Sequence, residues 1–331
     1  MAEPAGRGRR GAAPAADIVI ATPALAAANN GNWRTAQRWA RFLSGTFRVR
    51  ITDHWSGGSE ALMIALHARR SADAACAWRD TRGSRPLMVV LTGTDLYRDI
   101  AVDARARQTL ERADRLVVLN ELGAQALPPA LRHKVVVCLQ SSAARAPLPK
   151  PARHLRALMV GHLRHEKAPD TWFAAARLLA ARHDIVLDHI GGALEPALGA
   201  QALALQAELP GYRWLGPLPH GQTRRRIQAA GVLVHASRME GGAQAVIEAV
   251  VSGTPVIASR IDGNVGLLGA EHPGWFEVGD AAALAALLVR ARDDPAFLQA
   301  LAAAGARRAP LFDPAHERQT LLDAVRSLLG R

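Results

Sequence analysis

The chain has 331 residues, of which 49% are hydrophobic and 21% are charged, which excludes a wholly disordered protein and predicts two domains of about 150 residues each. Its formal net charge is +12, and all but three of the 41 basic residues are arginine. Because the arginines are scattered and aromatic residues make up only 5%, the charge favours anionic ligands but argues against a nucleic-acid-binding protein.

The number of cysteines and the length of the apolar runs indicate the redox compartment and whether the chain spans a membrane. Cys76 and Cys138 form neither a disulfide framework nor a cysteine–histidine cluster, so we expect a reducing cytoplasm and no bound metal. Residues 1–16 are basic and rich in Gly, Pro and Ala, which is typical of a disordered tail and not of a signal peptide. No apolar run approaches the ~20 residues of a membrane helix, so we expect a soluble protein without membrane insertion.

The first half alternates short apolar runs with helix-compatible segments. A β-branched run at 17–21 precedes a helical pattern that ends at Leu43, and further strands are predicted at 48–51, 61–66, 87–91, 116–119 and 135–139. Strands that alternate with helices indicate a parallel α/β sheet. We therefore assign 17–145 to an N-terminal Rossmann-like domain.

A proline-rich break at 141–153 interrupts this alternation, and we place the linker between domains at 146–153. The pattern then restarts, with strands predicted at 155–160, 185–190, 213–215, 232–235 and 255–258, and helices predicted at 170–182, 196–208, 223–230 and 244–252. We assign 154–312 to a second Rossmann-like domain. Residues 313–331 contain a last helix, expected at 315–329, which can pack back against the first domain. Ligands of such sheets bind at the carboxyl ends of the strands.

Two glutamates flank a glycine pair after the predicted strand 232–235. Glu240, Gly241 and Gly242 occupy the turn, and Glu248 lies in the helix that follows. Glycines allow a ligand close to the backbone, and the N–H groups of a helix start suit a diphosphate. We expect Glu240 to face the ligand and Glu248 to accept from ribose hydroxyls, although the same spacing also fits a plain strand–loop–helix turn.

A second glycine-led loop follows the strand 155–160. Gly161 begins it, and Arg164 and Lys167 are three residues apart, so they share a face if they start a helix and can converge on one diphosphate. A solvated basic helix start is the alternative. Gly191 and Gly192 end the next strand and offer backbone close to a nucleotide or, equally, an ordinary turn.

Polar residues also end three strands of the first half. Asn29, Asn30, Gly31 and Asn32 follow the first strand but lack the spacing of a dinucleotide site. His67 follows the third strand, and Thr94, Asp95 and Arg98 follow the fourth. Each is compatible with a structural role, but all lie at the expected ligand-binding edge.

Together these residues resemble the GT-B glycosyltransferases of the retaining family four type. The shared marks are the pair Glu240 and Glu248, Lys167 in its glycine-led loop and the glycine-rich first loop. The usual loop motif reads Gly-Arg-Leu-x-x-x-Lys; here His162 takes the place of the arginine, and Arg164 follows two residues later. The resemblance implies two Rossmann-like domains with a cleft between them.

Within that family the chain resembles the selenosugar synthases of bacterial selenoneine biosynthesis, over nearly all of its length except the first ~16 residues. The segments that carry this resemblance include 21–25, 29–33, 65–70, 91–99, 161–164, 237–242 and 263–269. The implied reaction joins selenophosphate to a UDP-sugar, such as UDP-N-acetylglucosamine or UDP-glucose, and releases UDP and phosphate. No metal or other cofactor is implied.

The residues are then expected to have three roles. Catalysis is assigned to Glu240, Arg164, Lys167 and His67. Binding of the nucleotide-sugar is assigned to Gly161, Gly191, Gly192, Gly241, Gly242 and Glu248. Binding of the acceptor is assigned to Asn29, Gly31, Asn32, Thr94, Asp95 and Arg98.

Two other enzyme activities remain open at this point. A conventional GT-B glycosyltransferase would move the sugar to a hydroxyl acceptor, and Arg34, Arg38 and Arg41 on the first helix leave a peripheral membrane contact possible. A UDP-sugar epimerase would release UDP without a second substrate.

Overall fold

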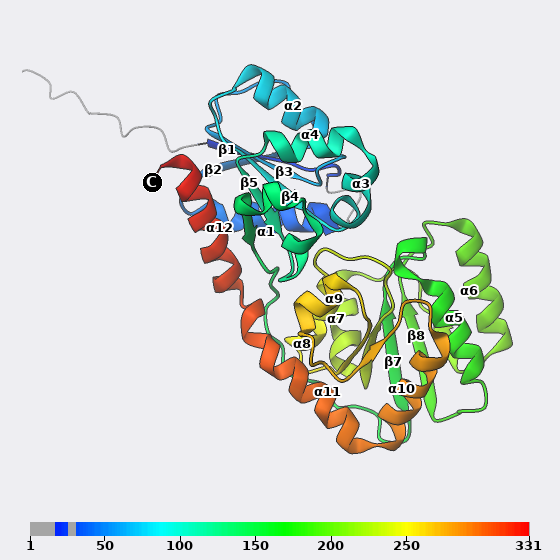
Figure 1. Ribbon diagram of the computed structural model, residues 1–331. Coiled ribbons are helices and arrows are strands. Elements are labelled where there is room, and N and C mark those ends of the chain that lie inside the picture. The colour runs from blue at the N-terminus through cyan, green and yellow to red at the C-terminus, as the bar shows by residue number, and fades with distance from the viewer. Residues whose placement is uncertain (1–16, 26–30, 331) are drawn as a thin grey trace, which may run out of the picture.

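A computed structural model describes residues 17–25 and 31–330 and folds them into two α/β domains (Figure 1). The N-terminal sheet has the order β2-β1-β3-β4-β5-β6, and every neighbouring pair is parallel. Its strands are β1 (Asp17–Ala21), β2 (Arg48–Thr52), β3 (Leu62–Leu66), β4 (Leu87–Leu91), β5 (Arg115–Val118) and β6 (Val135–Val137).

Helices cover both faces of this sheet, because its strands are apolar on both sides. The elements between the strands are α1 (Gly31–Leu43), α2 (Ala72–Thr81), the π-helical turn η2 (Asp95–Asp99), α3 (Ile100–Val102), α4 (Ala104–Arg112), η3 (Gly123–Ala126) and η4 (Pro129–Lys134). Residues of α2 and α4 pack into one core layer, and α1 packs into the other.

The C-terminal sheet is also parallel throughout, with the order β12-β11-β10-β7-β8-β9. Its strands are β7 (Leu155–Val160), β8 (Ile185–Ile190), β9 (Tyr212–Trp214), β10 (Val232–His235), β11 (Val256–Ser259) and β12 (Trp275–Phe276). Its helical elements are η5 (His165–Lys167), α5 (Pro169–Leu178), α6 (Pro196–Glu208), α7 (His220–Ala229), α8 (Gln244–Val250), α9 (Asp262–Leu268), α10 (Ala281–Asp293), α11 (Pro295–Arg308) and η6 (Ala309–Phe312).

The strand orders fix where ligands can bind. The chain direction across the sheet reverses between β1 and β3 in the first domain and between β7 and β10 in the second. Ligands of doubly wound sheets bind outside the carboxyl ends of the strands at this reversal. In the second domain, the loops after β7 and β10 are those that carry Lys167 and Glu240.

The chain passes between the domains twice, and the two crossings lie side by side. The first leaves β6 at Cys138, and the second leads from η6 to α12 (Pro314–Leu329). Ser142 donates its backbone N–H to the carbonyl of Phe312 at 3.2 Å. The N–H of Arg145 donates to the carbonyl of Val251 in the second domain, so the first crossing precedes the predicted linker 146–153. Residues of that segment bond to the end of α7.

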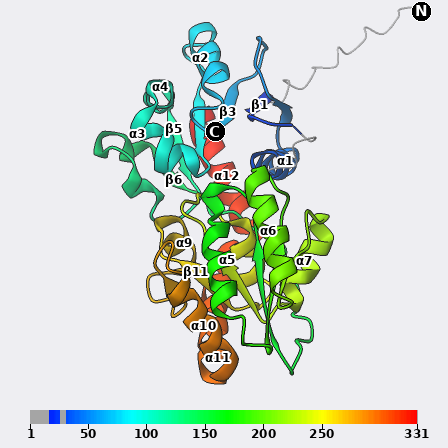
Figure 2. The ribbon, with the colours of Figure 1, turned by 90° about the vertical axis from the view of Figure 1, so that its right-hand side faces the viewer.

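The last helix, α12, returns to the N-terminal domain (Figure 2). Its apolar residues join the core beneath α1. Glu317 is fully buried there, and its carboxylate accepts from Trp39 on α1 at 2.7 Å and from the backbone N–H of Ser141 at 2.7 Å. Arg38 pairs with the same carboxylate. One side chain thus ties together α12, α1 and the first crossing.

Within the described residues, no helix is both long enough and apolar enough to cross a membrane.

Candidate functional site

Loops from both domains meet at the carboxyl ends of the two sheets. A Cβ atom on Gly93, in the loop after β4, would lie 2.8 Å from the backbone nitrogen of Gly241, in the loop after β10. The side chain of Arg98 reaches Glu166 in the loop after β7. These contacts bring the predicted acceptor and donor loops together.

The glycines after β7 and β8 hold two loops of the C-terminal domain against each other. The carbonyl of Gly161 accepts from Nε2 of His189 at 3.0 Å, and the N–H of Gly192 donates to Nδ1 of His162 at 3.0 Å. A Cβ atom on Gly191 would lie only 1.9 Å from the Gly161 oxygen, so this approach requires glycine. The contact of these three glycines with a nucleotide stays a prediction.

The ring of His162 does not supply the charge of the arginine that it replaces in the motif. Burial lowers its pKa, and Arg164 and Lys167 lower it further, so the ring is neutral at pH 7. Its Nδ1 accepts a hydrogen bond, and its Nε2 therefore carries the proton. The positive charge of this loop comes from Arg164 and Lys167.

Arg164 stands immediately before η5, and its side chain is about one third exposed. The Nε atom lies 3.9 Å from Oε2 of Glu166. This Nε atom is buried and has no hydrogen-bond partner among the described residues. The Nε–H group of Arg164 is thus an unused hydrogen-bond donor beside the predicted diphosphate site.

Lys167, Glu240 and His235 form a partly buried cluster of polar side chains between the loops after β7 and β10. The Lys167 ammonium pairs with Oε1 of Glu240, and Nε2 of His235 lies 3.3 Å from the same oxygen. Burial alone would raise the pKa of Glu240, but Lys167 first and His235 second hold it well below its usual range. Glu240 is therefore a fixed negative charge and not a proton donor at neutral pH.

Glu248 lies on α8, two turns after Glu240, and is nearly buried. His220 Nε2, at the start of α7, lies 2.7 Å from Oε1 of Glu248, and Arg224 Nη1 lies 3.9 Å from it. Two basic partners thus orient this carboxylate. Its predicted contact with ribose hydroxyls stays a prediction.

Gly241 and Gly242, predicted to approach a diphosphate, lie at the contact between the domains. A Cβ atom on Gly241 would be 2.5 Å from the carbonyl carbon of Thr92, and one on Gly242 would be 2.7 Å from Gln140 Oε1. Asn120, at the end of β5, donates its amide to the Gly241 carbonyl at 2.9 Å. Small residues here let the two backbones touch.

His67 is buried, and its ring contacts the Thr94 hydroxyl. It adopts the left-handed φ of 74°, is 2% exposed, and its Nε2 lies 3.0 Å from Thr94 Oγ1. The N–H of Arg70 donates to Nδ1 at 3.3 Å, so Nε2 carries the proton and donates to Thr94. Burial lowers the pKa of His67, and the nearby Asp95 offsets this only in part. This geometry gives His67 a positioning role in place of the direct catalytic role that we expected. Because Thr94 Oγ1 accepts from His67, the hydroxyl hydrogen of Thr94 can be donated to another group.

Asp95 is fully buried and holds the acceptor loops from within. Its Oδ1 accepts from the N–H groups of Thr92 and Gly93, both at 2.9 Å, and its Oδ2 accepts from the N–H of Ala68 at 2.9 Å. These bonds join the loops after β3 and β4. Because the carboxylate is enclosed and already accepts from three backbone donors, it orders these loops and is not exposed for the direct contact with an acceptor that we expected.

The other predicted acceptor residues lie at the same edge of the N-terminal sheet. Arg98 lies on η2, one turn after Thr94, and its side chain is 42% exposed. Gly31 and Asn32 open α1 after β1, and a Cβ atom on Gly31 would meet open space. Asn29 lies outside the described residues.

Three residues of this site were not predicted from the sequence. His235 ends β10 beside Glu240, Asn120 binds Gly241 from the other domain, and Glu166 pairs with Arg98. The last two contacts join loops that only the folded chain brings together. His235 is the exception, because a histidine at the end of a predicted strand beside a glutamate loop offered a clue.

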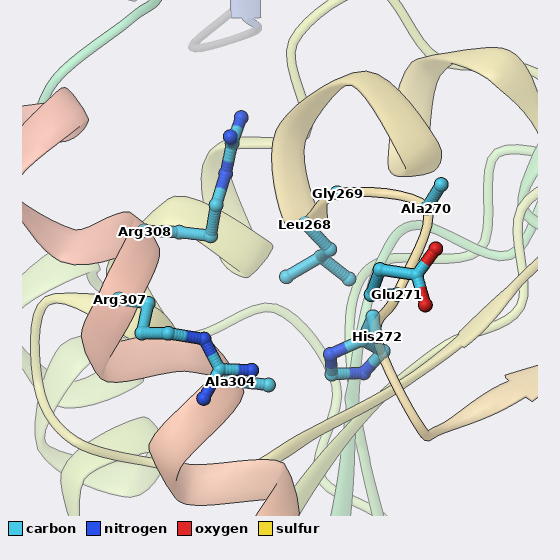
Figure 3. Close-up of a pocket in the computed structure, with 8 residues that line it drawn as sticks. All are labelled: Leu268, Gly269, Ala270, Glu271, His272, Ala304, Arg307 and Arg308. Carbon is cyan, nitrogen blue, oxygen red and sulfur yellow. The ribbon is translucent and has the colours of Figure 1, made fainter.

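A separate cavity of about 160 Å³ lies where α11 ends against the loop after α9 (Figure 3). Arg307, Arg308, Glu271 and His272 are among the residues that line it. It is at the opposite end of α9 from Gly263, whose Cβ position faces the Glu240 carbonyl. It contains none of the predicted site residues.

Comparison with protein families and curated proteins gives consistent results. The model of the family described as "Glycosyl transferases group 1" matches residues 140–308. A "D-inositol 3-phosphate glycosyltransferase" of Streptomyces avermitilis is 29% identical over 310 residues, which cover 83% of this chain and 64% of the relative. The Streptomyces coelicolor protein of the same name is 32% identical over 52% of this chain and 40% of its own length. The chain thus spans less than two thirds of these relatives.

Solved structures share the architecture. Sucrose-phosphate synthase from Thermosynechococcus elongatus superposes with a TM-score of 0.78 at 17% identity, over 95% of this chain and 99% of that one. HepE of Anabaena, solved in complex with UDP and glucose, superposes with a TM-score of 0.74 at 17% identity, over 94% and 100%. These likenesses confirm the two-domain GT-B fold.

Proposed function

The chain belongs to the glycosyl transferases group 1 family, and from this premise we propose that it is a selenosugar synthase. In this proposal the C-terminal domain binds a UDP-sugar, such as UDP-N-acetylglucosamine or UDP-glucose, and the N-terminal domain binds selenophosphate. The curated relatives are named as glycosyltransferases, and one structural neighbour was solved with UDP and glucose, which supports the UDP-sugar donor.

The proposed reaction replaces one bond at the anomeric carbon. Selenium forms a bond to C1 of the sugar, the bond from C1 to the diphosphate oxygen breaks, and UDP leaves with the electron pair. Water then cleaves the selenium–phosphorus bond, which gives a 1-selenosugar and phosphate. Selenophosphate is a strong nucleophile, so the site needs charge stabilisation more than a general base.

The donor side offers the charges that this step requires. Negative charge builds on the diphosphate as the C1–O bond breaks, and preorganised cations stabilise it. Lys167 and Arg164 lie on one loop for this role, while Glu240 keeps Lys167 in place through their ion pair. Glu240 is ionised, so we assign it to the sugar hydroxyls as an acceptor of hydrogen bonds.

One contact carries the proposal for an anionic acceptor. Arg98 of the N-terminal domain reaches the C-terminal domain, and its Nη1 lies 3.0 Å from Oε1 of Glu166, the residue before Lys167. A guanidinium from the acceptor half therefore adjoins the loop of the donor diphosphate. Such an arrangement supports a reaction in which two anions must be held next to each other.

A conventional transfer to a hydroxyl acceptor is the second candidate, because the curated relatives are named D-inositol 3-phosphate glycosyltransferases. In that case Arg98 would hold the phosphate of a phosphorylated polyol, and a hydroxyl group would attack C1. Such an attack needs a base, and the His67 ring is buried against Thr94. This favours the selenium nucleophile.

Mass spectrometry of the products tests the proposal. The protein is mixed with a panel of UDP-sugars and either selenophosphate, D-inositol 3-phosphate or neither. We expect a selenosugar and UDP only with selenophosphate. A sugar–inositol phosphate product at equal or greater rate would select the second candidate, and UDP release without any acceptor would reject both transfer reactions.

A further inference from the structure

We propose that the Glu166 carboxylate occupies the position on Arg98 that the anionic group of the acceptor takes when it binds. Glu166 pairs with Arg98 across the contact between the domains, and an acceptor anion must displace it. The inference rests on the proposed function, because it concerns the acceptor side of the same site. It makes Glu166 a specificity-determining residue that selects acceptors by charge.

Arg98 has two partners of different character. Its Nε donates to Asp99 Oδ1 at 3.0 Å, and its Nη1 donates to Glu166 Oε1 at 3.0 Å. Asp99 is buried on the same element and also accepts from Arg69 at 2.8 Å. Asp99 is thus a permanent partner that aims the guanidinium, while Glu166 comes from the other domain.

The backbone around Glu166 is held by hydrogen bonds, while its carboxylate lies at the contact between the domains. The Glu166 carbonyl accepts from the N–H of Arg238 at 2.9 Å, and the N–H of Lys167 bonds to the Arg164 carbonyl at 3.0 Å. Ala168 closes this turn in the left-handed conformation. The side chain can therefore turn away from Arg98 without moving the loop that carries Lys167.

Charge decides which ligands can make this exchange. A phosphate-type dianion offers Arg98 two oxygens and more negative charge than a carboxylate, so it can replace Glu166 on the guanidinium. A neutral hydroxyl acceptor brings no negative charge to Arg98, so its binding would break the Arg98–Glu166 ion pair without replacing it. Glu166 thereby disfavours neutral acceptors, as a repulsive element does in specific recognition.

Removal of the Glu166 charge should therefore strengthen anion binding, which is the opposite of what loss of a ligand-binding residue does. The Arg98 side chain is 42% exposed, and a pair of that exposure changes affinity by about two- to fivefold. Loss of Arg98 itself removes a charged donor and should weaken binding by about tenfold or more.

The experiment measures thiophosphate binding to the full chain by calorimetry, without UDP-sugar. We expect Glu166→Gln to bind thiophosphate about two- to fivefold more tightly than the wild type. Glu208→Gln is the matched control, because it makes the same chemical change in an exposed pair with Arg177 on the surface of α6. An equal gain in both variants, no gain, or weaker binding in Glu166→Gln overturns the proposal.

A double variant separates the exchange from a change in the loop. In the Arg98→Gln background Glu166 no longer holds the Arg98 guanidinium, and only Arg164, whose Nε lies 3.9 Å away, remains beside it. Glu166→Gln should then lose the gain in affinity that comes through Arg98. A gain that persists in that background overturns the proposal. Thermal melting of each variant checks that the fold is intact.

The outcome is also distinguishable from failure of the proposed function. If Glu166→Gln gains thiophosphate affinity through Arg98 but no variant forms a selenosugar, the selenosugar reaction is rejected and the exchange stands. If selenosugar forms, we expect Glu166→Gln to lower KM for selenophosphate while the KM for the UDP-sugar stays unchanged. A KM for selenophosphate that does not fall would contradict the exchange alone.

Discussion

Trp39 and Glu317 are 278 positions apart, yet the indole Nε1 donates to the Glu317 carboxylate at 2.7 Å. The same carboxylate pairs with Arg38 and accepts from the N–H of Ser141. Both oxygens of this buried carboxylate are therefore engaged, and their partners come from α1 and from the first crossing between the domains.

Glu317→Gln should lower the free energy of unfolding by about 3 kcal/mol, because it leaves Arg38 without its counterion inside the protein. Urea unfolding measures the change. Asp323→Asn on the exposed side of the same helix is the control, with an expected effect below about 0.5 kcal/mol. Equal stability of the two variants would contradict the assigned role of Glu317.

Lys167→Ala should reduce UDP-sugar turnover by about 100-fold or more, since it removes a cation from the predicted diphosphate site and leaves Glu240 unpaired. UDP release is the measurement. Lys134→Ala is the control, because its ammonium only binds the carbonyls of Glu111 and Ala113 at the end of α4. Near-normal turnover in Lys167→Ala would remove Lys167 from the site.

Glu248→Ala should raise KM for the UDP-sugar severely, because the carboxylate oriented by His220 is expected to bind the ribose. Steady-state kinetics with varied UDP-sugar measure this. Glu208→Ala, on the surface, should keep the wild-type KM. An unchanged KM in Glu248→Ala would show that the ribose is held elsewhere.

Gly241→Ala should reduce kcat about tenfold or more, because its Cβ atom would clash with the Thr92 backbone and keep the two loops apart. Gly221→Ala is the matched control, since a Cβ atom there has nothing within 4 Å. Turnover and small-angle scattering are measured together. A Gly241→Ala protein with normal turnover would mean that this backbone contact is not needed for catalysis.

Acidification should destabilise the protein partly through His189. Burial lowers its pKa to about 4 from the ordinary histidine value of 6.5, so between these values the unfolded chain binds a proton that the folded chain does not. The free energy of unfolding therefore falls as the pH falls through this window, by up to about 3 kcal/mol for this one group.

Thermal melting between pH 7 and 4 measures the effect. His189→Gln should show a flatter dependence on pH than the wild type, although it starts from a lower stability. Parallel curves would mean that other groups carry the whole dependence.

The strands were predictable because the sheets are buried on both faces and their apolar runs are uninterrupted. Predicted strands 17–21, 87–91, 155–160, 185–190 and 232–235 coincide with β1, β4, β7, β8 and β10. Helix ends were less predictable. The helix expected at 170–182 ends at Leu178, and Arg182 instead binds Asp184 and Asp293, a choice that depends on a distant carboxylate.

The residues of the site also divide into those that local sequence predicts and those that it does not. Lys167 and Glu240 were recognisable from their loops, and the strand order brings these loops together at the point of reversal. The pairs Arg98–Glu166 and Asn120–Gly241 join different domains, and no local pattern encodes such contacts. The burial of Asp95 was also not predictable, since a polar residue after a strand can face a ligand or support its own loop.

The paired crossings at Ser142 and Phe312 leave the two halves few ways to move. Covalent links at one place allow rotation about that place but resist sliding, and Glu317 clamps α12 to the same place. Motion of one half against the other is then close to a single angular coordinate. A rotation there would change the separation of Arg98 and Glu166, because these two residues belong to different domains.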